Sequence, residues 1–213
     1  MKTAFIAGAT GLIGRQLLDL LLKDTYYQKI IAVTRKPLDV VSSKLHNVVI
    51  DFSQLKSVAN ELKADDIYCC LGTTIKQAGS KEIFRKVDYE YPTELAKITK
   101  LNGANQYLLV SALGADKSSG IFYNQVKGET ELAINEVGFG SVHIMRPSLL
   151  IGPRKEHRSG EEAAKILYKY LNFLIPEKYK SIESIKVARA MIALAKQNKA
   201  GHFIYESITL QTY

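Results

Sequence analysis

Two kinds of segment alternate along the chain. Short segments are apolar at consecutive positions and rich in β-branched and aromatic residues, whereas longer segments repeat an apolar residue every three or four positions. The first pattern is typical of strands buried on both faces of a parallel sheet, and the second of amphipathic helices. The predicted strands contain residues 5–7, 30–33, 48–50, 67–71, 107–110, 142–145 and 203–205.

Four clear helical patterns lie among these strands, at residues 12–23, 82–101, 123–137 and 184–197. Pro92 interrupts the second pattern and predicts a kink or a restart of the helix there. Strands that alternate with helices in this way predict an α/β fold built on a doubly wound parallel sheet. Because the 213 residues contain no internal repeat and no linker-like tract, we expect a single domain over residues 1–213.

One long irregular stretch, residues 146–182, stands apart from this alternation. It contains three of the five prolines of the chain and a predicted helix at residues 160–174. Insertions that follow the carboxyl ends of strands are where α/β proteins build substrate sites. We therefore expect this stretch to form a small substrate-side lobe of the domain.

The composition is that of a globular protein, with 46% hydrophobic and 23% charged residues, and it excludes wholesale disorder. No apolar run approaches the roughly 18 residues of a membrane helix. The net charge of +8 comes from dispersed basic residues, which favours a solvated basic surface over a nucleic-acid interface. We therefore expect a small-molecule substrate, no nucleic-acid or membrane partner, and a monomer or homodimer.

The cysteines and the start of the chain bear on its location. Cys69 and Cys70 are adjacent and have apolar neighbours, which predicts two reduced, buried thiols. Glycines interrupt the apolar run at the start of the chain, so we interpret it as a first strand and not as a targeting segment. These features predict a cytoplasmic protein. The four histidines lie far apart without metal-binding spacing, so no metal site is predicted.

A glycine-rich turn follows the first predicted strand and opens the first predicted helix. Gly8 permits a tight turn, Gly11 lets the backbone approach a pyrophosphate, and Gly14 lets the helix pack closely on the sheet. The start of the helix offers free N–H groups and a positive dipole end to phosphates. This context makes the turn a dinucleotide-binding loop. Its predicted cofactor-binding residues are Gly8, Thr10, Gly11, Leu12, Ile13 and Gly14.

The residues after the second and third strands bear on the choice of nucleotide. Arg35 and Lys36 place cations where an NAD-binding site usually has a carboxylate, and they could bind a 2′-phosphate. This difference favours NADP(H) and leaves NAD(H) as the alternative cofactor. Asp51 follows the third strand, where it could accept a hydrogen bond from the adenine amino group or cap the next turn, since Ser53 follows it.

Three residues after the fifth strand form a candidate catalytic set. Ser111 follows that strand, and Tyr123 and Lys127 lie four positions apart on one helix face. A phenol with a pKa of about 10 is a poor base at neutral pH, and a nearby ammonium lowers that pKa. Tyr123 could then exchange a proton with a carbonyl or alcohol oxygen. Ser111 could bind the same oxygen, and Lys127 could also hold the nicotinamide ribose.

Together these motifs resemble the short-chain dehydrogenase/reductase superfamily. The segments SALGADKSS at 111–119 and YNQVKGE at 123–129, with the pair Arg146 and Pro147, are similar to its atypical branch, the HIV Tat-interactive protein family. The resemblance covers nearly the whole chain and implies a Rossmann fold that binds NADP(H). It also implies that Leu150 and Arg158 contact the cofactor.

Two features depart from the pattern of that superfamily. Many members have an Asn-rich turn after the fourth strand, where this chain has the sequence CLGT at residues 70–73. We place Leu71 and Gly72 of this turn among the cofactor-binding residues. Members also carry an Asn in the next helix for a proton relay, and Asp88 stands in that region here. An aspartate cannot donate a hydrogen bond as an amide does, so that relay does not transfer unchanged.

Two functions remain open from the sequence. The first is an NADP-dependent oxidoreductase that moves a hydride to or from a small carbonyl or alcohol substrate, with Tyr123 as proton donor or acceptor. The alternative is a non-catalytic NADP(H)-binding sensor or regulatory interaction protein, since a fold alone does not fix a function. The Ser–Tyr–Lys set favours the enzyme, whereas Asp88 and the altered turn favour the sensor.

Overall fold

The core of the protein is a seven-stranded, wholly parallel sheet. The computed structural model describes residues 2–153 and 176–213. Across the sheet the strands run in the order β3-β2-β1-β4-β5-β6-β9, which confirms the predicted doubly wound α/β fold. The strands are β1 (Lys2–Ala7), β2 (Tyr27–Thr34), β3 (Leu45–Val49), β4 (Asp66–Cys69), β5 (Gln106–Val110), β6 (Ser141–Arg146) and β9 (Gly201–Glu206).

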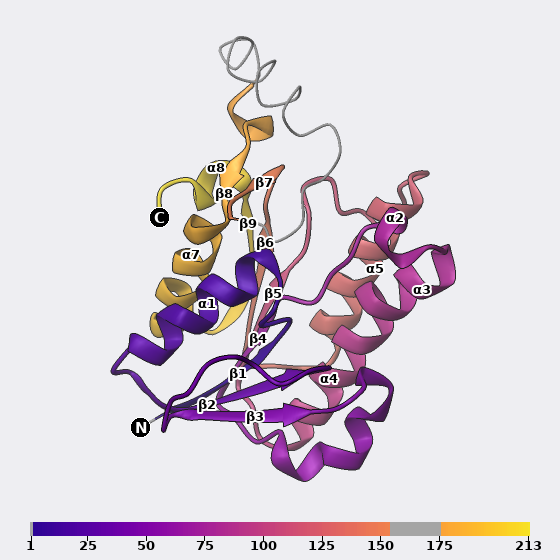
Figure 1. Cartoon of the computed structure of the whole chain (residues 1–213). Coiled ribbons are helices and arrows are strands. Elements are labelled where there is room, and N and C mark those ends of the chain that lie inside the picture. The colour runs from indigo at the N-terminus through magenta and orange to yellow at the C-terminus, as the bar shows by residue number, and fades with distance from the viewer. Residues whose placement is uncertain (1, 154–175) are drawn as a thin grey trace.

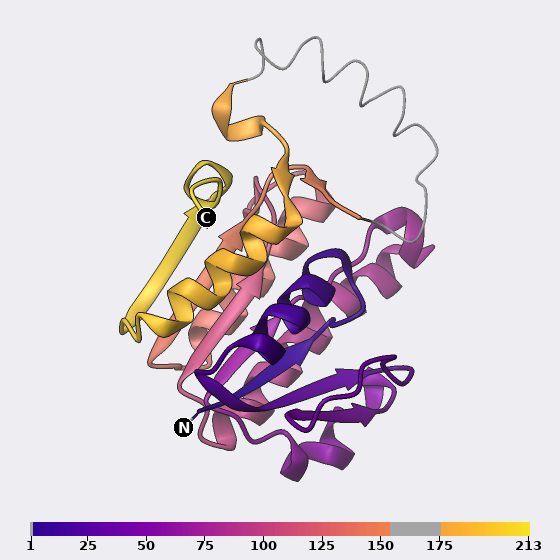
Figure 2. The same cartoon turned by 60° about the vertical axis from the view of Figure 1, so that its left-hand side comes forward.

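Helices cover both faces of this sheet, as Figures 1 and 2 show. On one face, α1 (Leu12–Lys23) and α7 (Ser184–Lys196) pack against each other. On the other face lie α4 (Tyr91–Leu101) and α5 (Phe122–Glu136). Two apolar clusters result, one beneath each layer, because the alternate faces of the strands are both buried.

The order of the strands reverses between β1 and β4. The chain moves outward through β2 and β3 on one side of β1 and through β4, β5, β6 and β9 on the other. The helices that follow β1 and β4 therefore lie on opposite faces of the sheet. In open α/β sheets ligands bind in the crevice outside the carboxyl ends of the strands at such a reversal, so the fold itself indicates where a cofactor would lie. We call this edge of the sheet the crevice.

The predicted helix at residues 82–101 is interrupted near Pro92. The chain forms α3 (Lys81–Arg85), a π-helical turn η2 (Lys86–Glu90) and then α4. Pro92 has no N–H for the carbonyl of Asp88, four residues earlier. The hydroxyl of Thr130 on α5 donates to that carbonyl at 2.8 Å instead. The π turn thus fixes Asp88 against α5.

Smaller elements complete the described chain. They are η1 (Phe52–Glu61), α2 (Ile75–Ala78), β7 (Leu150–Ile151), η4 (Glu177–Tyr179), β8 (Ile182–Glu183) and α8 (Ser207–Leu210). The parallel pair β7 and β8 joins the two ends of the predicted lobe. The predicted helix at residues 160–174 lies outside the described residues. No helix within residues 2–153 and 176–213 has the length and apolar character needed to span a bilayer.

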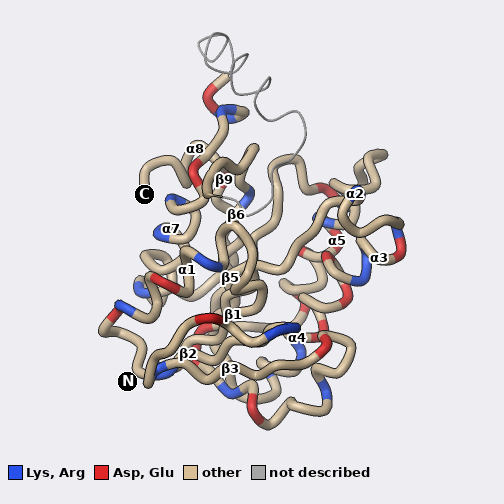
Figure 3. Tube along the Cα trace, viewed as in Figure 1, with Lys and Arg blue, Asp and Glu red and all other residues tan. Residues whose placement is uncertain are grey.

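Charged side chains are spread over the whole fold. Figure 3 shows Lys and Arg interspersed with Asp and Glu on the helices and loops. The described part of the chain contains no group of three or more His, Cys, Asp or Glu side chains arranged to hold a metal ion. The cysteines are both free thiols, with Cys69 buried and Cys70 half-buried.

Candidate cofactor and catalytic site

The glycine loop forms a close backbone turn at the crevice. Gly8 has a φ of 82°, and a Cβ on it would lie 2.4 Å from the carbonyl oxygen of Cys70, which follows β4. The N–H of Gly11 donates to the carbonyl of Gly8 at 3.0 Å. A Cβ on Gly14 would lie 2.1 Å from the same carbonyl oxygen. Side chains at Gly8 and Gly14 are therefore excluded, because each would collide with backbone atoms.

The N-terminus of α1 opens toward this crevice. Gly11 is the N-cap residue, and no side chain caps the first turn of the helix. The N–H groups of the first turn, which include those of Leu12 and Ile13, thus remain available to an anion, and the helix dipole favours negative charge there. Thr10 is exposed beside them. The predicted phosphate-binding residues thus lie together in the glycine loop and the first turn of α1.

Arg35 and Lys36 directly follow β2 and are both exposed. Asp51 lies near them after β3, where it caps η1 and accepts hydrogen bonds from the Ser53 N–H at 2.8 Å and the Ser53 hydroxyl at 2.6 Å. These bonds lower the pKa of Asp51, and the charges of Lys86 and Arg35 lower it further. The structure shows the capping role of Asp51, in which both bonds go to Oδ1, and its contact with the adenine amino group stays a prediction. The carboxylate lies within the electrostatic reach of Arg35.

Tyr123 and Lys127 share one face of α5 at the same end of the molecule. The ring of Tyr123 packs against Phe84 of α3, with centroids 5.4 Å apart. Lys127 is buried. Burial has the largest influence on the pKa of its ammonium and lowers it. Asp88 and then Tyr123 oppose this effect, so the pKa of Lys127 lies above its usual value. Lys127 is therefore a cation at neutral pH, with the phenol of Tyr123 in its electrostatic neighbourhood.

Asp88 is the ionic partner of Lys127, a contact that the sequence did not predict. Its Oδ1 lies 2.8 Å from Nζ of Lys127, in an ion pair whose angles fall short of a hydrogen bond, and its Oδ2 accepts from the N–H of Thr73 at 2.9 Å. Gly72 is exposed directly beside the pair: a Cβ on it would lie 3.4 Å from Asp88 Oδ1 and 3.5 Å from Lys127 Nζ. The turn after β4 thus covers this buried ion pair with backbone and no side chain at Gly72.

Ser111 follows β5 and is buried, but its hydroxyl is already engaged. It donates to Glu131 Oε1 at 2.5 Å. Glu131 is held in turn by Arg146, whose Nε and Nη2 donate to its two oxygens at 3.0 Å and 2.6 Å. The structure therefore brings Tyr123 and Lys127 together and places the Ser111 hydroxyl in a separate network. Glu131 was missed from the sequence, although it continues the four-residue spacing of Tyr123 and Lys127.

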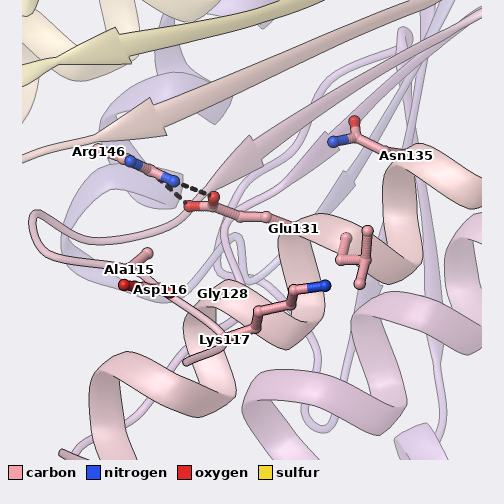
Figure 4. Close-up of a pocket in the computed structure, with 8 residues that line it drawn as sticks. Ala115, Asp116, Lys117, Gly128, Glu131, Asn135 and Arg146 are labelled. Atoms are coloured by element: carbon pink, nitrogen blue, oxygen red, sulfur yellow. Dashed lines mark hydrogen bonds and ion pairs between the residues drawn. The ribbon is translucent and has the colours of Figure 1, made fainter. Parts of the chain in front are cut away.

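Glu131 and Arg146 of this network also line a cavity of about 420 Å³, and Figure 4 shows their ion pair there. Neither the glycine loop nor Tyr123 nor Lys127 lines it. We therefore assign the cofactor to the crevice at the strand reversal and not to this cavity. The lining residues are Ala115, Asp116, Lys117, Gly128, Glu131, Leu132, Asn135 and Arg146.

The remaining predicted contacts lie around the crevice or beyond the described chain. Leu71 follows β4 beside Gly72 and is half-buried. Leu150 begins β7 and is half-buried against the apolar cluster beneath α1 and α7. Arg158 lies outside the described residues, so its predicted contact with the cofactor stays a prediction.

Comparison with known proteins agrees with this geometry. Residues 8–136 match the model of a family described as NAD(P)H-binding, and this range begins at the first glycine of the loop and ends with α5. The chain belongs to this NAD(P)H-binding family. The matched range includes the glycine loop, Arg35, Asp88, Tyr123 and Lys127, which are the main residues of the candidate site.

Curated relatives extend the similarity over most of the chain. Protein HTATIP2 of Rattus norvegicus is 35% identical over 90% of this chain and 80% of its own length. Protein FMP52, mitochondrial, of Debaryomyces hansenii is 33% identical over 92% of this chain and 88% of its own length. These relatives confirm the resemblance to the HIV Tat-interactive protein family.

Solved structures confirm the fold. The structure titled "MoeE5 in complex with UDP-glucose and NAD" superimposes with a TM-score of 0.73 over 95% of this chain and 74% of that one, at 16% identity. The Bordetella bronchiseptica enzyme WbmH in complex with NAD+ gives a TM-score of 0.70 over 97% of this chain and 76% of that one, at 15% identity. The Rossmann-type sheet is thus shared with proteins that hold NAD.

The relatives also overturn one prediction. We expected a cytoplasmic protein from the reduced cysteines and the glycine-interrupted start of the chain. Several relatives at 33–37% identity, from four yeasts, are named mitochondrial. The cytoplasmic prediction is wrong on this comparison, because reduced thiols and a strand-like start carry no information that separates one cell compartment from the other.

Proposed function

We propose that this protein is an NADP-dependent oxidoreductase that acts on a small carbonyl or alcohol substrate. The observation that carries the proposal is that the turn after β4 contacts both parts of the site: Cys70 lies against Gly8 of the glycine loop, and Gly72 lies against Lys127, one helical turn after Tyr123 on α5. When bound, NADPH supplies the hydride. Tyr123 gives its phenolic proton to the carbonyl oxygen as that oxygen gains negative charge, and the ammonium of Lys127 stabilises the phenolate that remains.

The nucleotide preference rests on Arg35 and Lys36. Both are exposed cations after β2, where a guanidinium and an ammonium can bind a 2′-phosphate by charge-assisted hydrogen bonds. Asp51 has no part in this preference, because the contact predicted for it is with the adenine amino group, which NADP(H) and NAD(H) share. The mitochondrial names of several relatives also support a search for the protein in mitochondria.

The interactions of Ser111 favour a second candidate. A serine whose hydroxyl is held by a buried glutamate is not free to bind a substrate oxygen. This observation supports a non-catalytic NADP(H)-binding sensor, in which the crevice holds the nucleotide and a partner reads its presence. The two candidates share the cofactor site and differ in whether Tyr123 ever transfers a proton.

Paired titrations test the shared part. We expect the purified protein to bind NADPH more tightly than NADH. Arg35→Ala should weaken NADPH binding by on the order of 1.5–3 kcal/mol and leave NADH binding nearly unchanged. Lys29→Ala, which removes an exposed cation from the body of β2, is the matched control. Equal wild-type affinities for the two nucleotides would contradict the proposed preference.

A turnover screen separates the candidates. The wild-type protein is incubated with NADPH and a panel of aldehydes and ketones, and the loss of absorbance of the reduced nicotinamide is followed. Oxidation of NADPH that depends on one carbonyl class supports the enzyme. Tight NADPH binding with no oxidation across the panel supports the sensor.

A further inference from the structure

Two buried charges meet beneath the turn after β4. The side chains of Lys127 and Asp88 are 7% and 0% exposed, and their charged atoms lie 2.8 Å apart. An ammonium removed from water to this degree loses most of its hydration and becomes easier to deprotonate. A buried carboxylate at this distance supplies the compensating charge.

Three separate features hold Asp88 in this place. The N–H of Thr73 donates to Oδ2, which fixes the carboxylate against the turn after β4. Pro92 and the π turn free the Asp88 carbonyl, and the hydroxyl of Thr130 binds it from α5. Thr130 lies three residues after Lys127 on the same helix. The backbone of Asp88 is thus tied to the helix that carries its ionic partner.

On one side the pair is covered by the backbone of the turn after β4. Gly72 brings no side chain over it, and Asp88 Oδ1 has no well-aligned hydrogen bond in the described structure. The titratable groups that influence Lys127 come from three elements: Asp88 on η2, Tyr123 on its own helix, and Cys69 on β4. Asp88 is the strongest of the three in keeping Lys127 charged.

We propose that Asp88 is the positioning residue that keeps Lys127 charged and aimed at Tyr123 and the cofactor crevice. The proposal rests on the proposed function for its catalytic consequence, but the ionisation of Lys127 is a property of the protein alone. Without Asp88 the burial of Lys127 is uncompensated. The ammonium then loses its proton more readily, and Tyr123 loses the cation that stabilises its phenolate.

The test measures Lys127 directly in the protein without nucleotide. Lysine Cε signals are followed by 13C NMR across pH, and the Lys127 signal is assigned by its loss in Lys127→Met. In the wild type we expect Lys127 to stay charged beyond pH 10.5. In Asp88→Asn the pH at which it loses its proton should fall by on the order of 1–3. An unchanged titration in Asp88→Asn overturns the proposal.

A second readout applies if hydride transfer occurs. Single-turnover rates of Asp88→Asn relative to wild type should fall by about threefold or more between pH 7 and pH 10, since Lys127 loses its proton over that range in the variant and stays charged in the wild type. A loss of rate that is equal at both pH values would mean a structural role and would overturn the proposal.

Two controls keep the outcomes separate. Glu94→Gln removes the same charge at an exposed ion pair with Lys56 and should leave the Lys127 titration unchanged. If Asp88→Asn does not fold, the double variant Asp88→Asn/Lys127→Met should recover the wild-type melting temperature, because neither charge is then left buried alone. Failure of that recovery overturns the proposal. A wild type that binds NADPH but transfers no hydride defeats the proposed function and leaves the NMR result to decide on Asp88.

Discussion

Two lysine–aspartate pairs lie at opposite ends of the same sheet. At the carboxyl edge, Lys127 pairs with Asp88 at 2.8 Å. At the amino edge, Lys2 at the start of β1 pairs with Asp66 at the start of β4, at 3.2 Å. The carboxylates of both aspartates are completely buried, so each would be costly without its partner.

The difference lies in what else each carboxylate binds. Asp66 also accepts from the hydroxyl of Tyr27 at 2.7 Å and from Nε2 of Gln106 at 2.8 Å. Asp88 has one backbone N–H besides its lysine, and the residue next to the pair in the turn after β4 is Gly72, which has no side chain. A saturated carboxylate holds strand ends together, whereas a carboxylate with spare capacity beside an open crevice suits a site that must accept a ligand. The comparison therefore divides the fold into a structural end and a functional end.

The largest expected effect is at the functional end, where folding and binding depend on one backbone contact. In Gly14→Val the new side chain starts 2.1 Å from the Gly8 carbonyl oxygen, so α1 must move away from the loop. We expect a loss of more than about 3 kcal/mol in the free energy of unfolding, together with loss of NADPH binding. Urea denaturation and nucleotide titration measure both.

Gly120→Ala is the control for that substitution, because a Cβ at Gly120 meets no atom within 4 Å. It should unfold like the wild type. If Gly14→Val keeps both its stability and its affinity for NADPH, the loop is not the phosphate-binding turn.

The structural end should respond in stability alone. Asp66→Asn removes the charge that pairs with Lys2 and disturbs the bonds from Tyr27 and Gln106. We expect about 2–4 kcal/mol less free energy of unfolding and an unchanged dissociation constant for NADPH. Asp19→Asn, at an exposed position of α1, should change neither quantity. A loss of NADPH affinity in Asp66→Asn without a loss of stability would contradict the division of the sheet into a structural end and a functional end.

A smaller effect at the same end depends on pH. His143 is buried in β6 between the Ser141 and Tyr205 hydroxyls, and burial lowers its pKa to about 4. The unfolded chain therefore binds a proton near pH 6.5 that the folded chain does not, so stability falls as pH falls from 6.5 toward 4. Between pH 7.5 and pH 5 the resulting loss in the free energy of unfolding is about 2 kcal/mol. His143→Gln should lose less stability over that range in urea unfolding, and an equal loss would refute the assignment.

The sequence predicted the parts of the molecule that depend on local spacing. The strands and helices follow from apolar periodicity, and the glycine loop and the Tyr123–Lys127 pair follow from spacings of three and four residues. Pro92 marked the break in the second long helix because a missing N–H acts within one turn. The π turn itself was not predicted, since it depends on the hydroxyl that α5 presents.

The parts that were missed depend on register between distant strands. Asp66 and Gln106 are single polar residues at the starts of apolar runs, and only the pairing of β4 with β5 places them opposite each other. The bond from Ser111 to Glu131 likewise depends on how β5, β6 and α5 pack. Nothing in the local sequence distinguishes a serine that faces a substrate from one that faces a buried glutamate.

The most direct test of the account is single-turnover hydride transfer by wild type and Tyr123→Phe, with NADPH and a carbonyl compound that the wild type reduces. Tyr123→Phe keeps the ring against Phe84 and removes only the phenolic proton. We predict a rate that falls by a factor on the order of 10² to 10⁴, with the dissociation constant for NADPH nearly unchanged. A variant that transfers hydride at the wild-type rate would contradict the central claim that Tyr123 is the proton donor.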